Sequence, residues 1–396
     1  MPRKKQTGFD PDRLNNLRRP KDLVPRILRR EMQPAPDKNS GLTDIRVIGV
    51  GGAGNNAINR MMKSGLDGVQ FVAVNTDAQD LHSSNAHRQI LIGEKCTDHL
   101  GSGGNPRLGE RAATESAEDL WKAVDGAHMV FITAGMGGGT GTGATPVIAD
   151  LATKAGALTV GVATIPFSFE GSRRMKIANY GLKEFEPRVD TLITVHNDKL
   201  LEHADARTAF SEAFVMADEM LHRGVQGIAD LITTTGLINV DFADVRSVMQ
   251  NSGTAMMGVG QAYGEERAMR AVREAMDSPL LNTSIDDASG VLLNITASAD
   301  VSMAEVNAAA AHVAEVAAPD ANIIFGTVVD PDMDQTIRVT LIATGFRSSD
   351  PAIGTGSGRN KIRQRTSTSV PAPSNVGLDL DADSDQTQNF QSLRSR

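Results

Sequence analysis

The sequence has few of the residues on which several protein classes depend. Of its 396 residues only one is a cysteine, Cys96, and aromatic residues make up 4% of the chain. A single thiol cannot form an internal disulfide, so a small secreted scaffold held by disulfides is excluded. We expect Cys96 to be a small, partly buried side chain in a reducing compartment. The core must be built from aliphatic and small side chains.

Long apolar runs and an excess of positive charge are also lacking. No stretch approaches the roughly 20 apolar residues that a helix needs to span a bilayer. No apolar segment follows the basic N-terminus, as a signal peptide requires. The formal net charge of −8 argues against a nucleic-acid-binding protein. We therefore predict a cytoplasmic protein of two domains plus tails, with no direct membrane span and no nucleic-acid partner.

Glycine, by contrast, is abundant, with 38 residues, and a first cluster follows a predicted strand. The apolar run 44–50 leads directly into Gly51-Gly-Ala-Gly-Asn-Asn56 and then into a helical pattern. The glycines at 49, 51 and 54 fit the dinucleotide fingerprint, and the next strand ends in Asn75-Thr-Asp77, where that fold places a ribose-binding acid. An NAD-binding domain is the first interpretation of this segment, and a plain strand-to-helix turn is the alternative.

A second and longer glycine cluster changes that interpretation. Gly135-Met-Gly-Gly-Gly-Thr-Gly-Thr-Gly143 follows the apolar run 129–132. A loop with so few side chains exposes its backbone N–H groups, and at a helix N-terminus these groups are suited to bind phosphate oxygens. We expect the helix to begin near Thr145-Pro146, because proline is tolerated in a first turn. One pyrophosphate needs one such loop, so two converging loops favour a longer phosphate chain. Neither loop has the Gly-Lys-Ser/Thr ending of a P-loop.

The remaining pattern predicts an α/β fold. From 42 to about 200, strand-like runs alternate with helical stretches, which is typical of a doubly wound, mostly parallel sheet that binds its ligand at the carboxyl ends of the strands. A long helix is predicted over 208–233, and a smaller α+β unit follows as far as 346. The predicted strands are 46–50, 71–75, 89–92, 128–133, 159–165 and 191–195 in the first unit and 289–297, 322–329 and 336–344 in the second, where helices are predicted over 242–250, 265–277 and 302–318.

Both ends of the chain differ in composition from this middle part. Residues 1–41 are polar and basic, and apolar residues between 23 and 32 recur near helical spacing. A flexible or packed arm is the main interpretation, and an amphipathic helix that touches an anionic membrane is the alternative. After residue 346, Ser, Thr, Gly, Pro and Asp dominate, which predicts a disordered linker and tail.

Taken together, these motifs resemble those of a known family. Gly137-Gly-Gly-Thr-Gly-Thr-Gly143 is similar to the signature of the tubulin/FtsZ GTPases. From about 42 to 346 the chain resembles the FtsZ proteins of bacterial cell division, whereas the first forty and last fifty residues lie outside the resemblance. The other matching segments are Gly49-Val-Gly-Gly-Ala-Gly-Asn-Asn56, Asn75-Thr-Asp77, Pro166-Phe-Ser-Phe-Glu-Gly171, Asn239-Val-Asp-Phe-Ala-Asp244 and Phe325-Gly-Thr-Val328.

The resemblance implies a division of labour along the chain. It implies a GTP-binding domain over 42–207, a central helix over 208–235, and a second domain over 236–346 that carries a catalytic loop. GTP or GDP would be bound with Mg²⁺ on the phosphates. The arm, 1–41, and the linker with its tail, 347–396, complete the chain.

Phosphate binding is implied for the backbone of both glycine loops. A third loop, Gly101-Ser-Gly-Gly-Asn-Pro106, resembles the γ-phosphate sensor of the family, although a plain loop is the alternative. Ser102 and Gly104 stand where alanines are usual, and we expect this departure to loosen the loop. The implied phosphate-binding residues are Gly52, Ala53, Gly54 and Asn55 in the first loop and Gly138, Gly139, Thr140, Gly141, Thr142 and Gly143 in the second.

Ribose and base recognition are implied for side chains outside those loops. Glu170 and Arg174, with Thr164 nearby, would contact the ribose and phosphate; without the resemblance the first two would be an ordinary i,i+4 surface pair. The base would contact Asp218, whose carboxylate can accept from both N1–H and N2–H₂ of guanine, a donor pair that adenine lacks. Otherwise Asp218 would be a solvated acid on a helix. The remaining base contacts implied are Asn56, Asn197 and a stacking Phe214.

The catalytic residues implied are Asn239, Asp241 and Asp244. From spacing alone, the two acids at the head of helix 242–250 would be an N-cap and a first-turn acid favoured by the helix dipole. In the family this loop inserts into the nucleotide pocket of the next subunit, where the acids polarise the attacking water. The two roles are compatible, and they imply a head-to-tail homopolymer.

The resemblance also implies a cellular role and partners. The chain would polymerise with GTP, hydrolyse it at the subunit interface and form the ring that organises septation at midcell. Membrane-anchor and division proteins would bind the tail, where Phe390, Leu393 and Arg394 loosely match the peptide that partners bind. The alternatives are a divergent filament-forming paralogue with weak hydrolysis and a Rossmann NAD(P)-dependent oxidoreductase.

Overall fold

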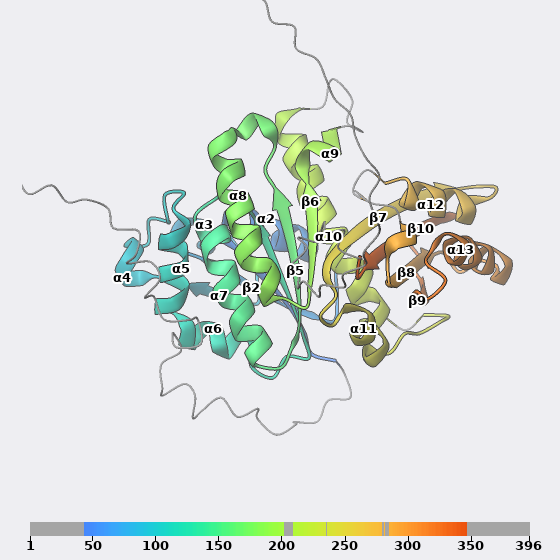
Figure 1. Ribbon diagram of the computed structural model, residues 1–396, viewed down its shortest axis with the longest axis horizontal. Coiled ribbons are helices and arrows are strands. Elements are labelled where there is room, and N and C mark those ends of the chain that lie inside the picture. The colour runs from blue at the N-terminus through green and yellow to red at the C-terminus, as the bar shows by residue number, and fades with distance from the viewer. Residues whose placement is uncertain (1–42, 202–208, 235, 279–280, 282–284, 347–396) are drawn as a thin grey trace, which may run out of the picture. The chain divides into compact units, whose positions relative to one another are not determined.

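A computed structural model describes residues 43–201, 209–234, 236–278, 281 and 285–346. Within these residues one sheet of ten strands has the order β3-β2-β1-β4-β5-β6-β7-β10-β8-β9 (Figure 1). The predicted basic arm, Thr208 and the tail residues Phe390, Leu393 and Arg394 lie outside the described residues. Among the described helices, none is both long and apolar enough to cross a membrane.

The first six strands are all parallel, which confirms the predicted fold class. The strand order runs outward in both directions from the β1–β4 pair, so the sheet has a topological switch point between them, and ligands bind at the carboxyl ends of strands at such a point. These strands are β1 (Ile45–Val50), β2 (Val69–Asn75), β3 (Arg88–Leu91), β4 (Met129–Gly135), β5 (Leu158–Ile165) and β6 (Thr191–His196).

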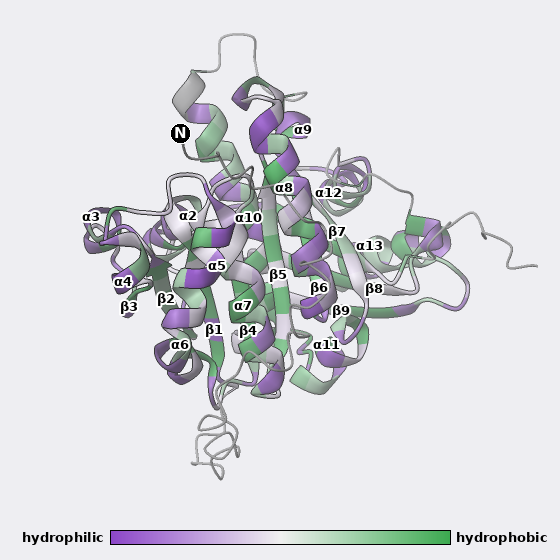
Figure 2. Cartoon of the chain, turned by 60° about the vertical axis from the view of Figure 1, so that its left-hand side comes forward, coloured by the Kyte–Doolittle hydropathy of each residue, from purple (hydrophilic) through white to green (hydrophobic). Residues whose placement is uncertain are grey.

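Helices pack against both faces of this parallel part. One apolar cluster joins the strands to α2 (Gly51–Lys63) and α10 (Phe210–Thr233), and a second joins them to α5, α6, α7 and α8. The central strands are hydrophobic along most of their length, as the green ribbons of Figure 2 show, because both of their faces are covered. The other elements are α3 (Ala78–His82), α4 (Glu94–Thr97), α5 (Pro106–Glu115), α6 (Ala117–Val124), α7 (Thr140–Lys154), η3 (Ser168–Glu170), α8 (Ser172–Phe185), η4 (Glu186–Arg188) and α9 (Asn197–Leu201).

One strand is missing from the sequence-based prediction. Strand β7 (Gly253–Tyr263) pairs parallel to β6 and antiparallel to β10, and so continues the sheet into its second half. The strand was not predicted because its glycines weaken the sequence pattern that is typical of strands. They are needed for packing: a Cβ on Gly258 or Gly260 would collide with the backbone carbonyls of helix α12.

The elements of the second half otherwise match the prediction to within two residues at their ends. Strands β8 and β10 are antiparallel and β9 is parallel to β8. A third apolar cluster lies between this part of the sheet and α12 and α13. The elements are α11 (Phe242–Met249), α12 (Arg267–Met276), η5 (Ile285–Asp287), β8 (Gly290–Ala297), α13 (Met303–Val316), β9 (Asn322–Val329) and β10 (Thr336–Thr344).

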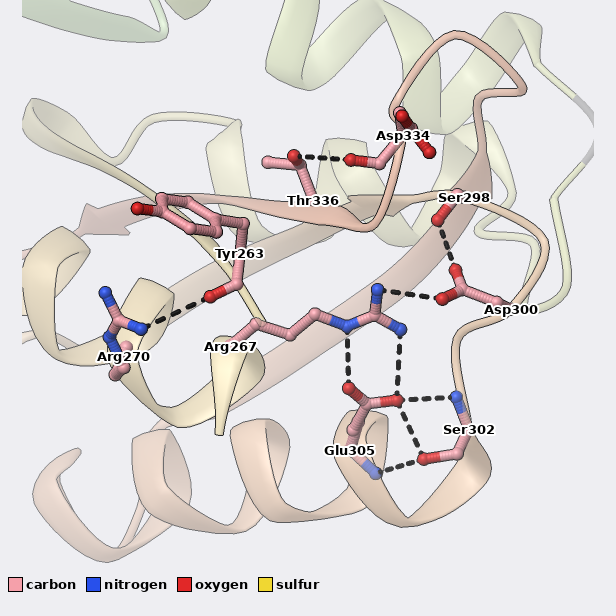
Figure 3. A network of polar contacts seen from close by, with 9 residues as sticks. All are labelled: Tyr263, Arg267, Arg270, Ser298, Asp300, Ser302, Glu305, Asp334 and Thr336. Atoms are coloured by element: carbon pink, nitrogen blue, oxygen red, sulfur yellow. Dashed lines mark hydrogen bonds and ion pairs between the residues drawn. The ribbon is translucent and has the colours of Figure 1, made fainter. Parts of the chain in front are cut away.

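A buried arginine joins α12 to α13, as Figure 3 shows. The side chain of Arg267 is 7% exposed; its Nε donates to Glu305 Oε1 at 2.8 Å and its Nη1 to Asp300 Oδ2 at 3.0 Å. Glu305 in turn accepts from the backbone N–H of Ser302, whose hydroxyl caps α13. Arg267 and Ser302 hold the pKa of Glu305 below its usual range. The network therefore fixes the N-terminal ends of both helices at one place.

We predict that Arg267→Ala lowers the free energy of unfolding by about 2 kcal/mol, because charged hydrogen bonds are lost at a buried position. Arg270→Ala is the matched control, since Arg270 lies on the same helix but is exposed and, among the described residues, contacts Tyr263 through its carbonyl and its ring. Its expected cost is below about 1 kcal/mol. Urea unfolding of the full chain measures both, and equal losses in the two variants would contradict a special role for Arg267.

Helix α10 carries another largely buried titratable side chain, the carboxyl group of Asp230. The pKa of Asp230 is raised to about 7, chiefly by burial and also by the charge of Asp330, while Arg338 and a hydrogen bond with Gln226 oppose the shift. Arg338 comes from β10, and its buried Nε has no hydrogen-bond partner. Burial is the largest cause, so the folded chain favours the neutral carboxyl group of Asp230.

We predict that stability falls as the pH rises from about 4 to about 7, because the folded state keeps a proton on Asp230 that the unfolded chain, with a pKa near 3.8, has released. Asp230→Asn should remove this part of the slope and make the chain more stable than wild type at pH 8. Asp67→Asn, at an exposed position, should keep the wild-type slope. Unfolding curves at several pH values measure it, and a slope unchanged in Asp230→Asn would refute the assignment.

Candidate nucleotide site

A cleft lies at the carboxyl ends of the parallel strands, where open α/β sheets bind their ligands. Twelve of the residues singled out in the sequence line it: Gly52, Ala53, Gly138, Gly139, Thr140, Gly141, Thr164, Glu170, Arg174, Asn197, Phe214 and Asp218. The structure adds Val50, Gly51, Ser102, Gly135, Met136, Pro166 and Ala217.

Two helix N-termini meet in this cleft. Helix α2 begins at Gly51, directly after β1, and α7 begins at Thr140, shortly after β4. The first N–H groups of each helix have no partner within the helix, and they carry the positive end of its dipole. The two ends together form a site for an anion.

The predicted start of α7 near Thr145-Pro146 is wrong by about five residues. Pro146 lies inside the helix, where it removes only the bond to the carbonyl of Thr142. Helix α5 passes so close to this first turn that a Cβ on Gly143 would collide with the carbonyl of Pro106, which explains a glycine inside the helix. The second loop is therefore shorter than the glycine run suggests.

The first and second glycine loops approach each other through backbone atoms, with no side chain between them. A Cβ on Gly51, whose φ is +69°, would lie 2.9 Å from the N atom of Gly141. A Cβ on Gly141 would lie 2.8 Å from the carbonyl oxygen of Gly135 and 3.3 Å from that of Val50. Gly138, in contrast, has nothing within 4 Å of its Cβ position. Packing alone therefore requires glycine at positions 51 and 141, before any ligand is bound.

The third loop is attached to the second by side-chain hydroxyls. Ser102 is buried, and its Oγ lies 2.9 Å from Oγ1 of Thr140. Oγ1 of Thr140 also lies 2.6 Å from Oγ1 of Thr76, at the end of β2. The hydroxyl of Ser102 thus makes a contact with the second loop that alanine could not make.

Glu170 and Arg174 form the i,i+4 pair that their spacing predicts. Arg174 Nη1 donates to Glu170 Oε2 at 2.5 Å, and the backbone N–H of Phe167 donates to Oε1. The side chain of Glu170 is 9% exposed, whereas that of Arg174 is 53% exposed. Glu170 is therefore fixed in place at the edge of the cleft, with both carboxylate oxygens already accepting one bond.

Asp218 has a partner that the sequence did not reveal. Arg60, on α2, donates from Nε to Oδ2 of Asp218 at 2.9 Å. Burial raises the pKa of Asp218 above its usual range, and the hydrogen bond from Arg60 opposes this shift. Because the two residues are 158 positions apart, no local pattern could have paired them. Oδ1 of Asp218 is not used in this contact.

Two buried amide side chains lack partners among the described residues. Both side-chain polar atoms of Asn55 and Oδ1 of Asn197 are buried without a hydrogen bond. Asn197 lines the cleft at the end of β6, and Asn55 lies in the first turns of α2. Buried polar groups normally have a partner, so Oδ1 of Asn197, which lines the cleft, fits a site that is completed by a polar ligand.

Five predicted phosphate or base contacts do not line the cleft. Asn55 is buried behind it, and Asn56 is exposed on α2. Gly54 and Gly143 face neighbouring backbone: a Cβ on Gly54 would lie 2.5 Å from the Thr133 carbonyl oxygen. Thr142 accepts from the N–H of Gly137 and is buried. The four buried residues among these five, all except Asn56, lie behind the loops.

The predicted catalytic residues lie away from this cleft. Asp241 is the N-cap of α11 and accepts from the N–H of Asp244 at 2.9 Å, so the capping interpretation is confirmed. Both acids are exposed, and Asn239 accepts from the N–H of Gly236. Arg246 of α11 donates to the carbonyls of His128 and Gly156, which precede β4 and β5. The helix therefore lies at the amino ends of the strands, opposite the cleft (Figure 1).

Comparison with known proteins agrees with this architecture. Residues 44–205 match the family model of the tubulin/FtsZ GTPase domain, and residues 253–347 match that of the FtsZ C-terminal domain. An empty FtsZ dimer from M. jannaschii is 46% identical over 83% of this chain and 92% of its own length, with a TM-score of 0.75. The chain belongs to the FtsZ family.

A second FtsZ structure from M. jannaschii, of a mutant, is 47% identical over 77% of this chain and 92% of its own, also with a TM-score of 0.75. More distant is CetZ2 from Haloferax volcanii, a GTPγS-bound protofilament that is 24% identical over 78% of this chain and 95% of its own, with a TM-score of 0.67. The likeness to CetZ2 shows the fold alone. Membership of the FtsZ family leaves the oxidoreductase alternative without support.

We predict that Gly141→Ala lowers the free energy of unfolding by about 1–3 kcal/mol, because the new methyl group would press on backbone carbonyls that cannot move independently. Gly138→Ala, three residues earlier in the same segment, should change it by no more than about 0.5 kcal/mol. Thermal unfolding of the nucleotide-free chain compares the two. A Gly141→Ala chain as stable as the Gly138→Ala chain would mean that the two loops are not held as tightly as described.

Proposed function

We propose that this FtsZ-family chain binds GTP in the cleft, polymerises head to tail and hydrolyses GTP at the interface between subunits. The observation that carries this proposal is the separation of two sets of residues. The phosphate-binding features lie at the carboxyl ends of the strands, and the acids of α11 lie at the amino ends. One subunit cannot bring the two together, whereas two subunits stacked along the strand direction can.

The position of the nucleotide follows from the strand order. Asn197, Phe214 and Asp218 come from the end of β6 and from α10, and the glycine loops follow β1 and β4. The base would therefore lie at the β6 end of the cleft and the phosphates at the β1 end, with Glu170 and Arg174 between them. Phe214 would stack on the ring.

Guanine is favoured over adenine by the carboxylate of Asp218. Arg60 donates to Oδ2, and its positive charge opposes the rise in the pKa of Asp218 that burial causes. Oδ1 is then left to accept from the guanine N1–H and N2–H₂ groups. Adenine has no donor in the position of N1–H, so it would leave Oδ1 of Asp218 without that donor.

A magnesium ion on the phosphates would neutralise the charge that develops there. Among the residues described, no group of three or more His, Cys, Asp or Glu is arranged to hold a metal ion, so the phosphates would supply most of its ligands. This is the usual way in which Mg²⁺ is bound.

Hydrolysis would depend on Asp241 and Asp244 of the next subunit. Both carboxylates are exposed, and the N-cap bond of Asp241 uses only one of its oxygens. An exposed acid can orient and polarise a water molecule once the interface excludes solvent. The same contact repeated between identical subunits is heterologous, and it produces filaments instead of closed dimers.

At the level of the cell, we propose a cytoplasmic protein that forms the division ring at midcell and binds anchor proteins through its C-terminal tail. The FtsZ relatives support this role. The CetZ2 structure, as a protofilament with GTPγS, supports filament formation and fits the second candidate, a divergent filament-forming paralogue. The two candidates differ in the rate of hydrolysis and in the localisation of a fluorescent fusion.

The decisive experiment is GTP hydrolysis measured against protein concentration, with light scattering in the same cuvette. We expect the rate per molecule to rise above a threshold together with scattering, because the active site is completed only by assembly. A rate per molecule that does not depend on concentration would place all the chemistry in one chain. The roles of Asp241 and Asp244 would then be wrong.

We predict that Asp244→Ala binds GTP as the wild type does but loses turnover by at least about a hundredfold, as removal of a group that acts on the attacking water does. The cap from Asp241 uses the backbone of residue 244, so the helix should still form. Asp67→Ala, at a distant exposed acid, is the control. Mixing Asp244→Ala with the binding-defective Asp218→Ala should restore part of the activity, since some interfaces then combine GTP with an intact Asp244. No gain on mixing would argue against a shared site.

A further inference from the structure

A groove that is separate from the nucleotide cleft runs along the outer face of α7. Helix α7 lies between α5 and α6 on one side and α8 on the other, as Figure 1 shows, and these neighbours form the walls. The lining residues of α7 extend along one face of the helix, from Thr142 in its first turn to Lys154 at its end. At 1.5 Å per residue this face is about 18 Å long. The face and its walls form the α7 groove.

The floor of the α7 groove is apolar and only partly covered. Pro146, Val147 and Leu151 of α7 form this floor, and Val147 is half-buried. Tyr180 of α8 adds an aromatic ring that is 49% exposed. Apolar side chains that remain accessible along the length of a groove are typical of a surface that receives an amphipathic helix.

Two carboxylates lie on opposite walls of the α7 groove, in the part nearer the nucleotide cleft. Glu110 of α5 is beside the first turn of α7, because its backbone N atom would lie 2.7 Å from a Cβ on Gly143. Glu184 of α8 lies on the other wall. The pKa of Tyr180 is raised chiefly by burial and also by both of these carboxylates, although nearby arginines oppose the shift. This part of the groove therefore attracts positive charge.

The far end of the α7 groove is basic. Lys154 ends α7, and the carbonyl of Arg188 accepts from the hydroxyl of Thr153 at the same level. Arg188 also forms ion pairs with Asp150 at 3.5 Å and Glu184 at 3.1 Å, and so offsets part of their charge. The groove thus changes sign along its length, from acidic near the cleft to basic near the amino ends of the strands.

The basic arm that precedes the described residues matches the groove in length and in pattern. Residues 23–32 contain five apolar residues near helical spacing, with Pro25 where a first helical turn tolerates it. A helix of these ten residues would be about 15 Å long, so it fits a groove of about 18 Å. Its charged residues are Arg26, Arg29 and Arg30, followed by Glu31. The segment is basic along most of its length and acidic near its end.

The place where the arm joins the body sets the direction in which this segment would lie. The backbone N–H of Asp44 donates to Nδ1 of His128, and the carbonyl of His128 accepts from Leu158, four residues after the end of α7. The arm therefore joins at the basic end of the groove. Residues 33–42 can span up to about 33 Å, which is more than the groove requires. A segment that enters here brings Glu31 to the basic end and its arginines toward the carboxylates.

The covalent link favours the chain's own arm over a second copy as the occupant. A flexible link of this length gives an effective concentration in about the millimolar range. A contact with a dissociation constant of about 0.1 mM would then be formed about nine-tenths of the time. A second copy would need a similar concentration in solution to compete.

We propose that residues 23–32 bind as a short helix in the α7 groove of their own chain. The apolar side of the segment covers Val147 and Tyr180, and the order of its charges fixes its direction. Because Thr142 and Gly143 also line the groove, the bound segment lies directly behind the second glycine loop. The inference goes beyond the proposed function and does not depend on it, since neither the groove nor the segment requires a nucleotide.

The test is cross-linking between two engineered thiols in the full chain. Cys96→Ser removes the natural thiol, and the substitutions Leu28→Cys and Val147→Cys place one thiol in the segment and one in the floor of the groove. We expect a short bismaleimide to join this pair within one chain at least about tenfold faster than the pair Leu14→Cys and Val147→Cys. Residue 14 lies outside the segment, so only the general effective concentration of the arm brings it to the groove.

Further substitutions in the arm protect the test against a folding defect, because they leave the body of the fold unchanged. Ile27→Asp, added to the reactive pair, should remove its advantage, whereas Leu17→Asp, which lies in the arm outside the segment, should keep it. Equal rates for the two pairs would overturn the proposal. Cross-links found only in dimers would overturn it in favour of a second copy. Absence of the cross-link together with binding to phosphatidylglycerol vesicles that Ile27→Asp abolishes would assign the segment to a membrane surface instead.

Discussion

The side-by-side placement of two helix N-termini is the constraint on which the rest of this structure depends. Helices α2 and α7 begin at the ends of neighbouring strands, β1 and β4, and aim their unpaired N–H groups into one cleft. Two positive dipole ends repel each other, so the arrangement is unfavourable until an anion lies between them. The protein holds it in place by packing. Glycines let α2, α5 and α7 approach to backbone contact, and the apolar clusters on both faces of the sheet fix the strands beneath. An anion site of this kind is prepared by the fold and needs no cationic side chain.

Close backbone approach is also how this chain compensates for its lack of aromatic residues. Where large side chains are few, a core gains contact by bringing elements nearer to one another. Gly258 and Gly260 let α12 lie directly on β7, and Gly227 brings α10 to Thr340 on β10. Helix α10 in this way touches the nucleotide cleft through Asp218 and the second half of the sheet through Gly227 and Asp230. A shift of this helix would be felt at both places, because neither contact leaves room for an independent adjustment.

The sequence predicts the parts of this structure that depend on local pattern. The buried run of β1, the cap at Asp241 and the α/β alternation all follow from neighbouring residues. The parts that it does not predict depend on distant partners. Strand β7 does not match the pattern of a strand because its glycines are required by the close packing of α12. Helix α7 begins inside a glycine run, where α5 leaves no room for a side chain on Gly143. In the candidate site, the lining residues follow from the two loops and from the family resemblance. The pairing of Arg60 with Asp218, and the bonding of Ser102 to Thr140, require the fold itself.

The attachment of α11 to the carbonyls before β4 and β5 has a consequence for any assembly. The strands themselves then set the distance between the cleft and the acidic loop, about 25 Å for the eight residues of β5 at roughly 3.3 Å each. A parallel sheet resists compression along its strands, so this distance stays constant. A filament of such subunits would have unlike ends, one presenting an open cleft and the other an uncovered acidic loop. The direction of the strands in each subunit would thus determine the polarity of the filament.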